Sequence, residues 1–124
     1  MEKYITVDGK KMRMVANARV PRIYRNLFNS DLILDMQKLT EGYKAGAQGE
    51  TLPIEVLTIF ENVAWVFLKE GGEEVGNNPD EWLETIEGMF SIYEVLPQII
   101  QLWKLNNKTT SNPPRKNKSN NQRT

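Results

Sequence analysis

The chain opens with alternating apolar and polar residues, a two-residue period that is typical of β-strands. Tyr4–Val7 and Met12–Val15 carry this alternation on either side of Asp8-Gly9, a dipeptide favoured in two-residue type I′ turns. The pattern predicts a β-hairpin in which Val7 pairs with Lys10. One face of that hairpin is apolar and must pack on helices, because an isolated hairpin is only marginally stable in water. The residues of this face are Ile5, Val7, Met12 and Met14.

Apolar residues then recur at helical spacing in two short segments. Pro21 suits a first helical position and is followed by Ile23, Tyr24, Leu27 and Phe28. Asn29 or Ser30 is expected to cap a second helix that ends at Gly42. This second helix carries Leu32, Ile33, Met36 and Leu39 on one face. Residues 43–50 are predicted to form a flexible loop.

A third helix is predicted from Thr51 as the cap, with Pro53 near its start, to Gly71-Gly72 past its end. Large apolar residues cover this helix on nearly all sides, which indicates a central position in the core. They are Ile54, Val56, Leu57, Ile59, Phe60, Val63, Trp65, Val66, Phe67 and Leu68.

Two further helices have clear start patterns. Asn78-Pro79-Asp80-Glu81 combines a capping residue, a proline at the first position and an acid three residues after the cap. Ser91–Glu94 repeats the capping-box spacing and begins a fifth helix, where Pro97 marks a kink or the true start. The stripe of this last helix is Ile92, Val95, Leu96, Ile99 and Trp103. The whole pattern predicts a mostly α-helical domain at residues 1–105, with about five helices and an N-terminal hairpin.

The balanced charge of the chain hides a strong segregation. Residues 1–30 carry seven basic and two acidic side chains, whereas residues 31–103 carry three basic and fourteen acidic ones. The rest is basic, and residues 106–124 contain no acid and no apolar residue larger than proline. Such a segment cannot bury enough surface to offset its ordering entropy, so a disordered basic tail is expected. The tail either aids solubility or docks on an acidic surface.

Catalytic and cofactor chemistry finds little support in the residues. The chain has no cysteine and no histidine, which excludes disulfides, thiol nucleophiles and most zinc sites. Its glycines match neither phosphate-binding pattern, and its carboxylates are best explained as a solvated face. These residues lead us to expect a protein that is not an enzyme and has no cofactor or metal. No run reaches 18 apolar residues, so we also expect it to be soluble and cytoplasmic.

The last predicted helix has more apolar residues than one stripe needs. Ile100, Leu102 and Leu105 lie off that stripe and, with Tyr93, predict a second apolar edge for a protein partner. Alternatively, a small five-helix domain buries both edges. Four such side chains contribute roughly 8 kcal/mol gross, against an association cost of about 4–15 kcal/mol. A single contact would therefore be weak and would gain strength by repetition.

These segments resemble the tail assembly chaperones of long-tailed (siphovirus-type) bacteriophages or prophages of Gram-positive hosts. The resemblance lies in Asn78–Leu83, Phe90–Trp103 and Thr109–Ser111 with the basic end, and extends to the Asp-Gly hairpin and Asn29–Ile33. It implies a helical, self-associating protein of the host bacterial cytoplasm that is absent from the mature virion. Such a chaperone binds the tape measure protein and keeps it soluble until the tail tube polymerises around it.

The resemblance also implies partners and partner-binding residues. The partners are the phage tape measure protein, further copies of the chain and a longer form made by ribosomal frameshifting, and no membrane is implied. The acidic body and the absence of aromatic residues from the tail argue against nucleic acid as a partner. The partner-binding residues expected from the resemblance and the apolar edge are Trp82, Ile92, Tyr93, Leu96, Ile99, Ile100, Leu102 and Trp103. An alternative from another class is a small regulatory protein that binds nucleic acid through its basic tail.

Overall fold

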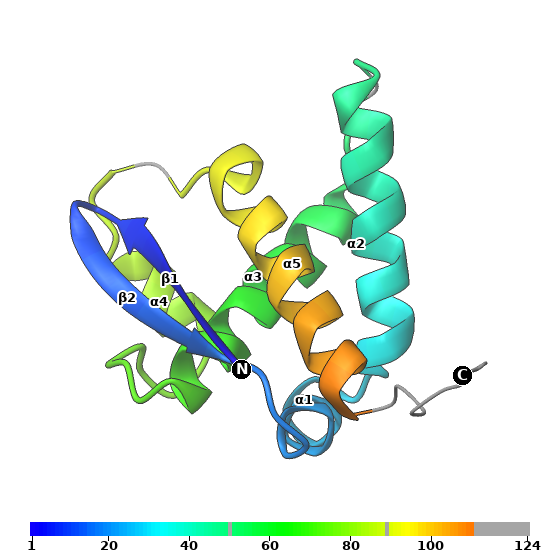
Figure 1. Ribbon diagram of the computed structural model, residues 1–124. Coiled ribbons are helices and arrows are strands. Elements are labelled where there is room, and N and C mark those ends of the chain that lie inside the picture. The colour runs from blue at the N-terminus through cyan, green and yellow to red at the C-terminus, as the bar shows by residue number, and fades with distance from the viewer. Residues whose placement is uncertain (50, 89, 111–124) are drawn as a thin grey trace.

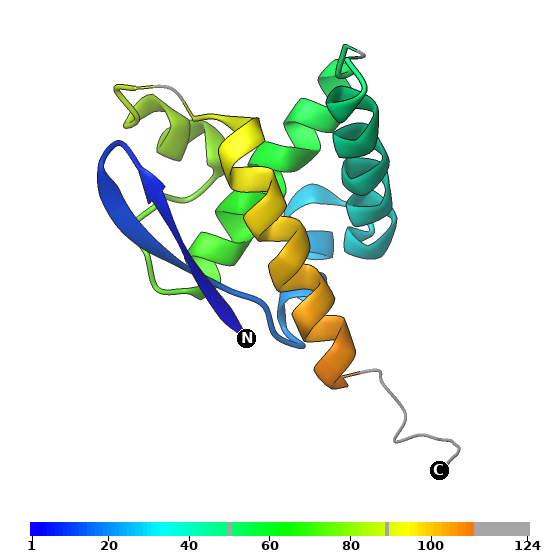
Figure 2. The ribbon, with the colours of Figure 1, turned by 45° about the horizontal axis from the view of Figure 1, so that its top comes forward.

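In a computed structural model, which describes residues 1–49, 51–88 and 90–110, five helices pack with one N-terminal hairpin. Helix α5 lies in front of α3, with the hairpin on one side and α2 on the other (Figure 1). A second view gives the same order, with the N-terminal half of α5 crossing α3 (Figure 2). The predicted fold, mostly α-helical with a hairpin at the N-terminus, is confirmed.

The hairpin joins β1 (Glu2–Val7) to β2 (Lys10–Val15) in the predicted register, with Val7 opposite Lys10. Asp8 and Gly9 both have positive φ, 55° and 74°, as a type I′ turn requires. The four predicted inward residues are buried against the helices. The turn is also tied to the loop before α5, because the Asp8 carboxylate accepts hydrogen bonds from the backbone N–H groups of Glu87 and Gly88, both at 2.7 Å.

Helix α3 (Ile54–Glu70) is central, as its apolar circumference predicts. Nine of its residues are buried, and it contacts β2, α1, α2, α4 and α5. Trp65 is sealed in this core and donates its indole N–H to the carbonyl of Val75 at 2.9 Å. The predicted cap is wrong: the residue before the helix is Pro53, which makes no side-chain cap, so Thr51 has no capping role.

Helix α2 (Leu32–Ala47), which follows α1 (Val20–Phe28), differs from its prediction at both ends. Asp31 caps α2 by accepting from the N–H groups of Ile33 and Leu34, whereas Asn29 adopts the left-handed conformation that ends α1. Gly42 does not end α2. A Cβ atom at Gly42 would lie 2.8 Å from Cγ1 of Val56, so this glycine permits close packing of α2 on α3. The predicted loop therefore begins late, after another turn of helix.

Helix α4 (Pro79–Glu84) begins as predicted, with the Asn78 side chain accepting from the N–H of Glu81 at 2.9 Å. Helix α5 (Ile92–Thr110) contains Pro97 in its interior, so this proline does not mark the helix start. The helix runs five residues past the predicted boundary at Leu105. The remainder of the predicted basic tail, 111–124, lies outside the described residues.

Candidate partner-binding groove

Most of the residues predicted to bind a partner lie in the core of the fold. Six are almost fully buried: Trp82, Ile92, Leu96, Ile99, Ile100 and Leu102. The expectation that α5 exposes Ile100 and Leu102 along a second apolar edge is wrong, since Leu102 has no accessible surface and Ile100 keeps only 8%. The physical reason is that α5 is covered from several directions at once, by β1, α3 and α2.

Two of the predicted residues do reach the surface. Tyr93 is 62% exposed at the start of α5, and a Cβ atom at Gly46 of α2 would lie 3.7 Å from its ring. Trp103, two turns and more further along α5, is partly buried and borders a hollow shared with Met36 of α2. Helices α2 and α5 are therefore antiparallel neighbours, with Tyr93 and Trp103 near opposite ends of their contact.

A groove follows the line where α2 and α5 meet. Its wider part has a volume of about 360 Å³ and is lined by Thr40, Tyr43, Lys44, Pro97, Ile100, Gln101 and Lys104. Its narrower part has a volume of about 240 Å³ and is lined by Met36, Gln37, Thr40, Glu41, Lys44 and Trp103. The two parts share Thr40 and Lys44, so we treat them as one feature and call it the α2–α5 groove.

Helical spacing explains why these residues line one groove. On α5, Pro97, Ile100 and Lys104 follow one another at intervals of three and four, so they occupy one face of the helix. On α2, Met36, Thr40 and Tyr43 repeat the same spacing. The apolar lining comes from the ring of Pro97 and the partly buried Tyr43 and Trp103, together with the accessible edge of Ile100.

Sequence reasoning missed the α2 wall of this groove. Tyr43 and Lys44 fell in the predicted loop because Gly42 suggested a helix end. The spacing Met36, Leu39 and Tyr43 continues the apolar stripe through Gly42 and was the available signal.

The charge of the groove differs from that of the domain. Lys44 on α2 and Lys104 on α5 are exposed, and neither has an ion-pair partner among the described residues. The described lining of the wider part includes no acid, whereas the narrower part adds Glu41. An excess of positive charge therefore borders an apolar floor, within a stretch of chain that is strongly acidic overall.

A buried carboxylate lies elsewhere, at the joint of α1 and α2. Asp35 is 5% exposed and accepts hydrogen bonds from the Tyr24 hydroxyl at 2.6 Å and from the Ser30 hydroxyl at 2.9 Å. Burial first, and then the hydrogen bond and charge of Asp35, raise the pKa of Tyr24 above its ordinary value. The cluster is closed to a substrate and ties α1 to α2. Within the described ranges, no group of three or more acidic, histidine or cysteine side chains could hold a metal ion.

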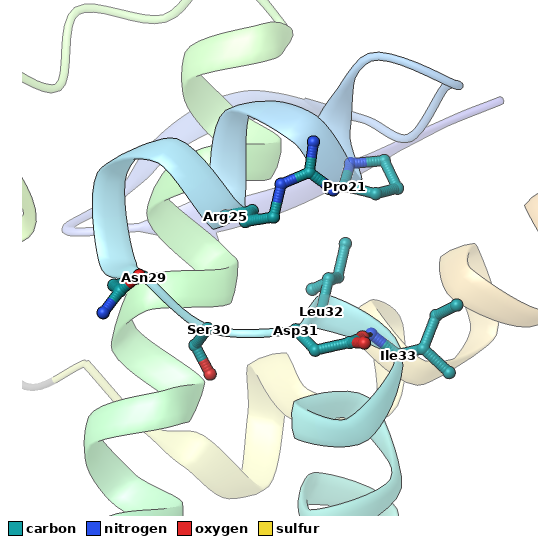
Figure 3. A pocket seen from close by; sticks show the side chains of 7 residues that line it. All are labelled: Pro21, Arg25, Asn29, Ser30, Asp31, Leu32 and Ile33. Atoms are coloured by element: carbon teal, nitrogen blue, oxygen red, sulfur yellow. Dashed lines mark hydrogen bonds between the residues drawn. The ribbon is translucent and has the colours of Figure 1, made fainter.

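A second hollow, of about 370 Å³, lies at the turn between α1 and α2 (Figure 3). Pro21, Leu32 and Ile33 supply its apolar lining, and Arg25 extends across its α1 side. Its remaining lining is polar and comes from Asn29, Ser30 and Asp31. The Asp31 carboxylate is already engaged as the α2 cap and Ser30 bonds Asp35, so this hollow presents fewer free groups than its composition suggests.

No helix in the described part of the chain is both long and apolar enough to span a membrane. Comparisons of the chain with models of protein families, with curated protein sequences and with solved structures gave no match. The features of the described residues that bear on function are therefore the α2–α5 groove and the charge pattern.

Proposed function

We propose that this protein is a phage tail assembly chaperone, which binds amphipathic helices of a tape measure protein and keeps that protein soluble before the tail tube forms. The observation that carries the proposal is the α2–α5 groove, an apolar trough between two antiparallel helices. Grooves of this form suit the apolar face of a third helix, which inserts residues at one-turn spacing. The resemblance of the sequence to such chaperones supports the same partner.

The modest size of the groove fits a chaperone that must release its client. The wider part holds a few side chains, so one groove would contribute a weak contact once the costs of association are subtracted. The resemblance implies that a tape measure protein is a very long helical rod. Many chaperone copies along one rod would together shield it, and each copy could leave separately when tube subunits arrive. Further copies of the chain and a frameshifted longer form are part of this proposal.

The binding residues of the proposal are fewer than the resemblance implies. Ile100 and Trp103 line the groove and Tyr93 lies beside Gly46 of α2, whereas Ile92, Leu96, Ile99 and Leu102 of α5 and Trp82 of α4 are buried in the core. Thr40, Tyr43 and Pro97 join the binding set. No observation on the described residues favours the alternative of a nucleic-acid-binding regulator, whose proposed contacts depend on the basic end of the chain.

Co-expression with the tape measure gene of the same genome tests the proposal. The wild-type protein is expected to raise the soluble fraction of the tape measure protein several-fold. Thr40→Trp, which fills the groove, should remove most of that gain. Thr58→Trp on the exposed face of α3 is the matched control and should keep it. Circular dichroism of both variants checks that each still folds.

Two results would contradict the proposal. The first is a tape measure protein that is equally soluble without this chain. The second is full chaperoning by Thr40→Trp. Deleting residues 111–124 tests the nucleic-acid alternative. That alternative would be favoured if the protein lacks chaperone activity and shows salt-dependent DNA binding that the deletion abolishes.

A further inference from the structure

The two lysines of the α2–α5 groove stand on opposite walls. Lys44 projects from the last turn of α2 and Lys104 from the second half of α5, and both line the wider part of the groove. A cation on a groove wall interacts favourably with an anion on a helix that lies between the walls, whereas it repels a cation there. The lining thus discriminates between occupants by the charge that flanks their apolar stripe.

Three of the described cations outside the groove are already engaged in ion pairs. Arg13 pairs with Glu2, Arg19 with Glu70 and Lys38 with Glu55. The two groove lysines have no such partner among residues that the structure describes, so their charges remain available to an incoming molecule. Glu41 opposes them only at the narrower end, near Trp103.

The basic end of this same chain is a poor occupant. Residues 111–124 carry four basic side chains and no acid. They would bring positive charge between Lys44 and Lys104, and they offer no apolar residue larger than proline for the floor. Charge complementarity therefore points to another molecule.

We infer that the α2–α5 groove selects amphipathic helices whose apolar stripe is flanked by glutamate or aspartate. The inference names which tape measure segments the chaperone would bind, and in this respect it rests on the proposed function. The preference of the groove itself for acidic helices rests only on the lysine pair and the apolar floor. Acidic flanks should strengthen binding about tenfold over basic flanks at low salt, and high salt should reduce the difference.

The test uses two fluorescein-labelled synthetic helical peptides of about 20 residues, roughly 30 Å long. Both carry the same leucine stripe, flanked by glutamates in one and by lysines in the other. Fluorescence anisotropy with the full chain measures both affinities at low salt and at about 0.5 M NaCl. The wild-type protein is expected to prefer the acidic peptide at low salt. Equal affinities, or no binding of either peptide, would overturn the inference.

Charge reversal locates the effect. Lys44→Glu with Lys104→Glu should invert the preference, because both side chains are exposed and the floor is unchanged. Arg22→Glu with Arg25→Glu on α1 makes the same change of charge outside the groove and should leave the preference intact. An acidic preference that survives in the groove variant, or disappears in the α1 variant, would overturn the assignment. Lys44→Gln with Lys104→Gln, together with melting curves, separates loss of charge from loss of fold.

A second copy of the chain is the competing occupant. Three results together would assign the groove to a subunit contact and overturn the inference. Sedimentation would show that the wild-type protein self-associates, both peptides would fail to bind, and the Lys44→Glu/Lys104→Glu variant would be monomeric.

The proposed function and the charge selection can be contradicted separately. Chaperoning that is blocked by Thr40→Trp but unaffected by charge reversal would overturn only the charge selection. Peptide selection without any solubilisation of the tape measure protein would overturn only the proposed function.

Discussion

The buried Asp35 is the residue whose surroundings have the clearest energetic consequence. Its two hydroxyl partners come from α1 and from the turn before α2, so the cluster fixes the angle at which the chain reverses. A buried carboxylate that loses a donor retains its desolvation cost, which makes each of these hydrogen bonds expensive to remove. This cluster fixes the position of α2 relative to α1. The groove depends on that position because α2 forms one of its walls.

Tyr24→Phe should destabilise the protein by about 1.5–3 kcal/mol near neutral pH, since the ring is kept and only the hydrogen bond to Asp35 is lost. The pKa of Tyr24 is raised in the folded protein, whereas an unfolded tyrosine ionises near pH 10. The contribution of Tyr24 is therefore fully present below about pH 10 and is lost as the pH rises above it. Urea unfolding at pH 8 and pH 11 should show the difference between variant and wild type shrinking. A difference that is the same at both pH values would contradict this assignment.

A substitution at Glu61 is expected to stabilise the folded protein. Partial burial on α3, and then the charge of Asp80, raise the pKa of Glu61, so its ionised form opposes folding. Its contribution favours the fold at acidic pH and is lost as the pH rises. Glu61→Gln should therefore stabilise the protein at pH 7 by a few tenths of a kcal/mol, up to about 0.5 kcal/mol, and should be neutral below about pH 4. Thermal melts at both pH values check this, with Glu41→Gln as an exposed control; a loss of stability at pH 7 would refute it.

At the scale of elements, the hairpin and the end of α3 are in unusually close contact. A Cβ atom at Gly71 would lie 2.1 Å from the backbone carbonyl oxygen of Arg13, so β2 passes directly over this glycine. The backbone N–H of Arg13 donates to Glu73 at 2.7 Å just beyond it. The glycine at this position is needed for space, since its φ of −76° is open to any residue.

Gly71→Ala should cost about 2–3 kcal/mol, because the hairpin must shift away from α3. Gly72→Ala is the matched control. It has open space around its added methyl group but a φ of +85°, so it should cost only about 1 kcal/mol through backbone strain. Denaturant unfolding gives the two values, and amide exchange should show loss of protection in β2 only for Gly71→Ala. Equal costs for the two substitutions would show that the close approach is absent.

The sequence predicted the elements whose signals are local and missed those set by packing. The hairpin register followed from Asp8-Gly9, and the central place of α3 followed from its apolar circumference. The end of α2 was misplaced, because a glycine that makes room for Val56 looks the same in sequence as one that ends a helix. The first turn of α2 shows the same limit, since three adjacent residues could each cap it and only geometry selects Asp31.

At the scale of the whole molecule, the sequence could predict surplus apolar residues on α5 but not which of them stay accessible. Burial of Leu102 and near-burial of Ile100 depend on how closely the hairpin, α2 and α3 surround α5, and no periodicity in α5 encodes that. The sequence therefore placed most of the candidate site on α5, on more faces of that helix than the structure leaves accessible. The apolar residues of α5 that line the groove are Pro97, Ile100 and Trp103, and Tyr43 and Lys44, from the segment predicted as a loop, lie on its other wall.

The charge segregation seen in the sequence can be assigned to particular parts of the structure. Two ion-paired arginines, Arg13 and Arg19, and two arginines of α1 account for four of the seven basic side chains of residues 1–30, while Lys44 and Lys104 flank the groove. The proposed client helix would thus meet an apolar floor with positive walls on a domain that is otherwise acidic. The net charge of zero conceals this local contrast, and in our proposal the local contrast, not the total charge, selects the partner.

Site-specific photo-crosslinking tests the central claim most directly. A photoreactive benzoylphenylalanine at Gln101, an exposed position on the groove wall, is activated in cells that co-express the tape measure protein. The same group at Thr58 on α3 is the control. The account predicts a crosslink to the tape measure protein from position 101 and none, or far less, from position 58. Crosslinks from position 58 alone, or none from position 101 while the client is soluble, would contradict it.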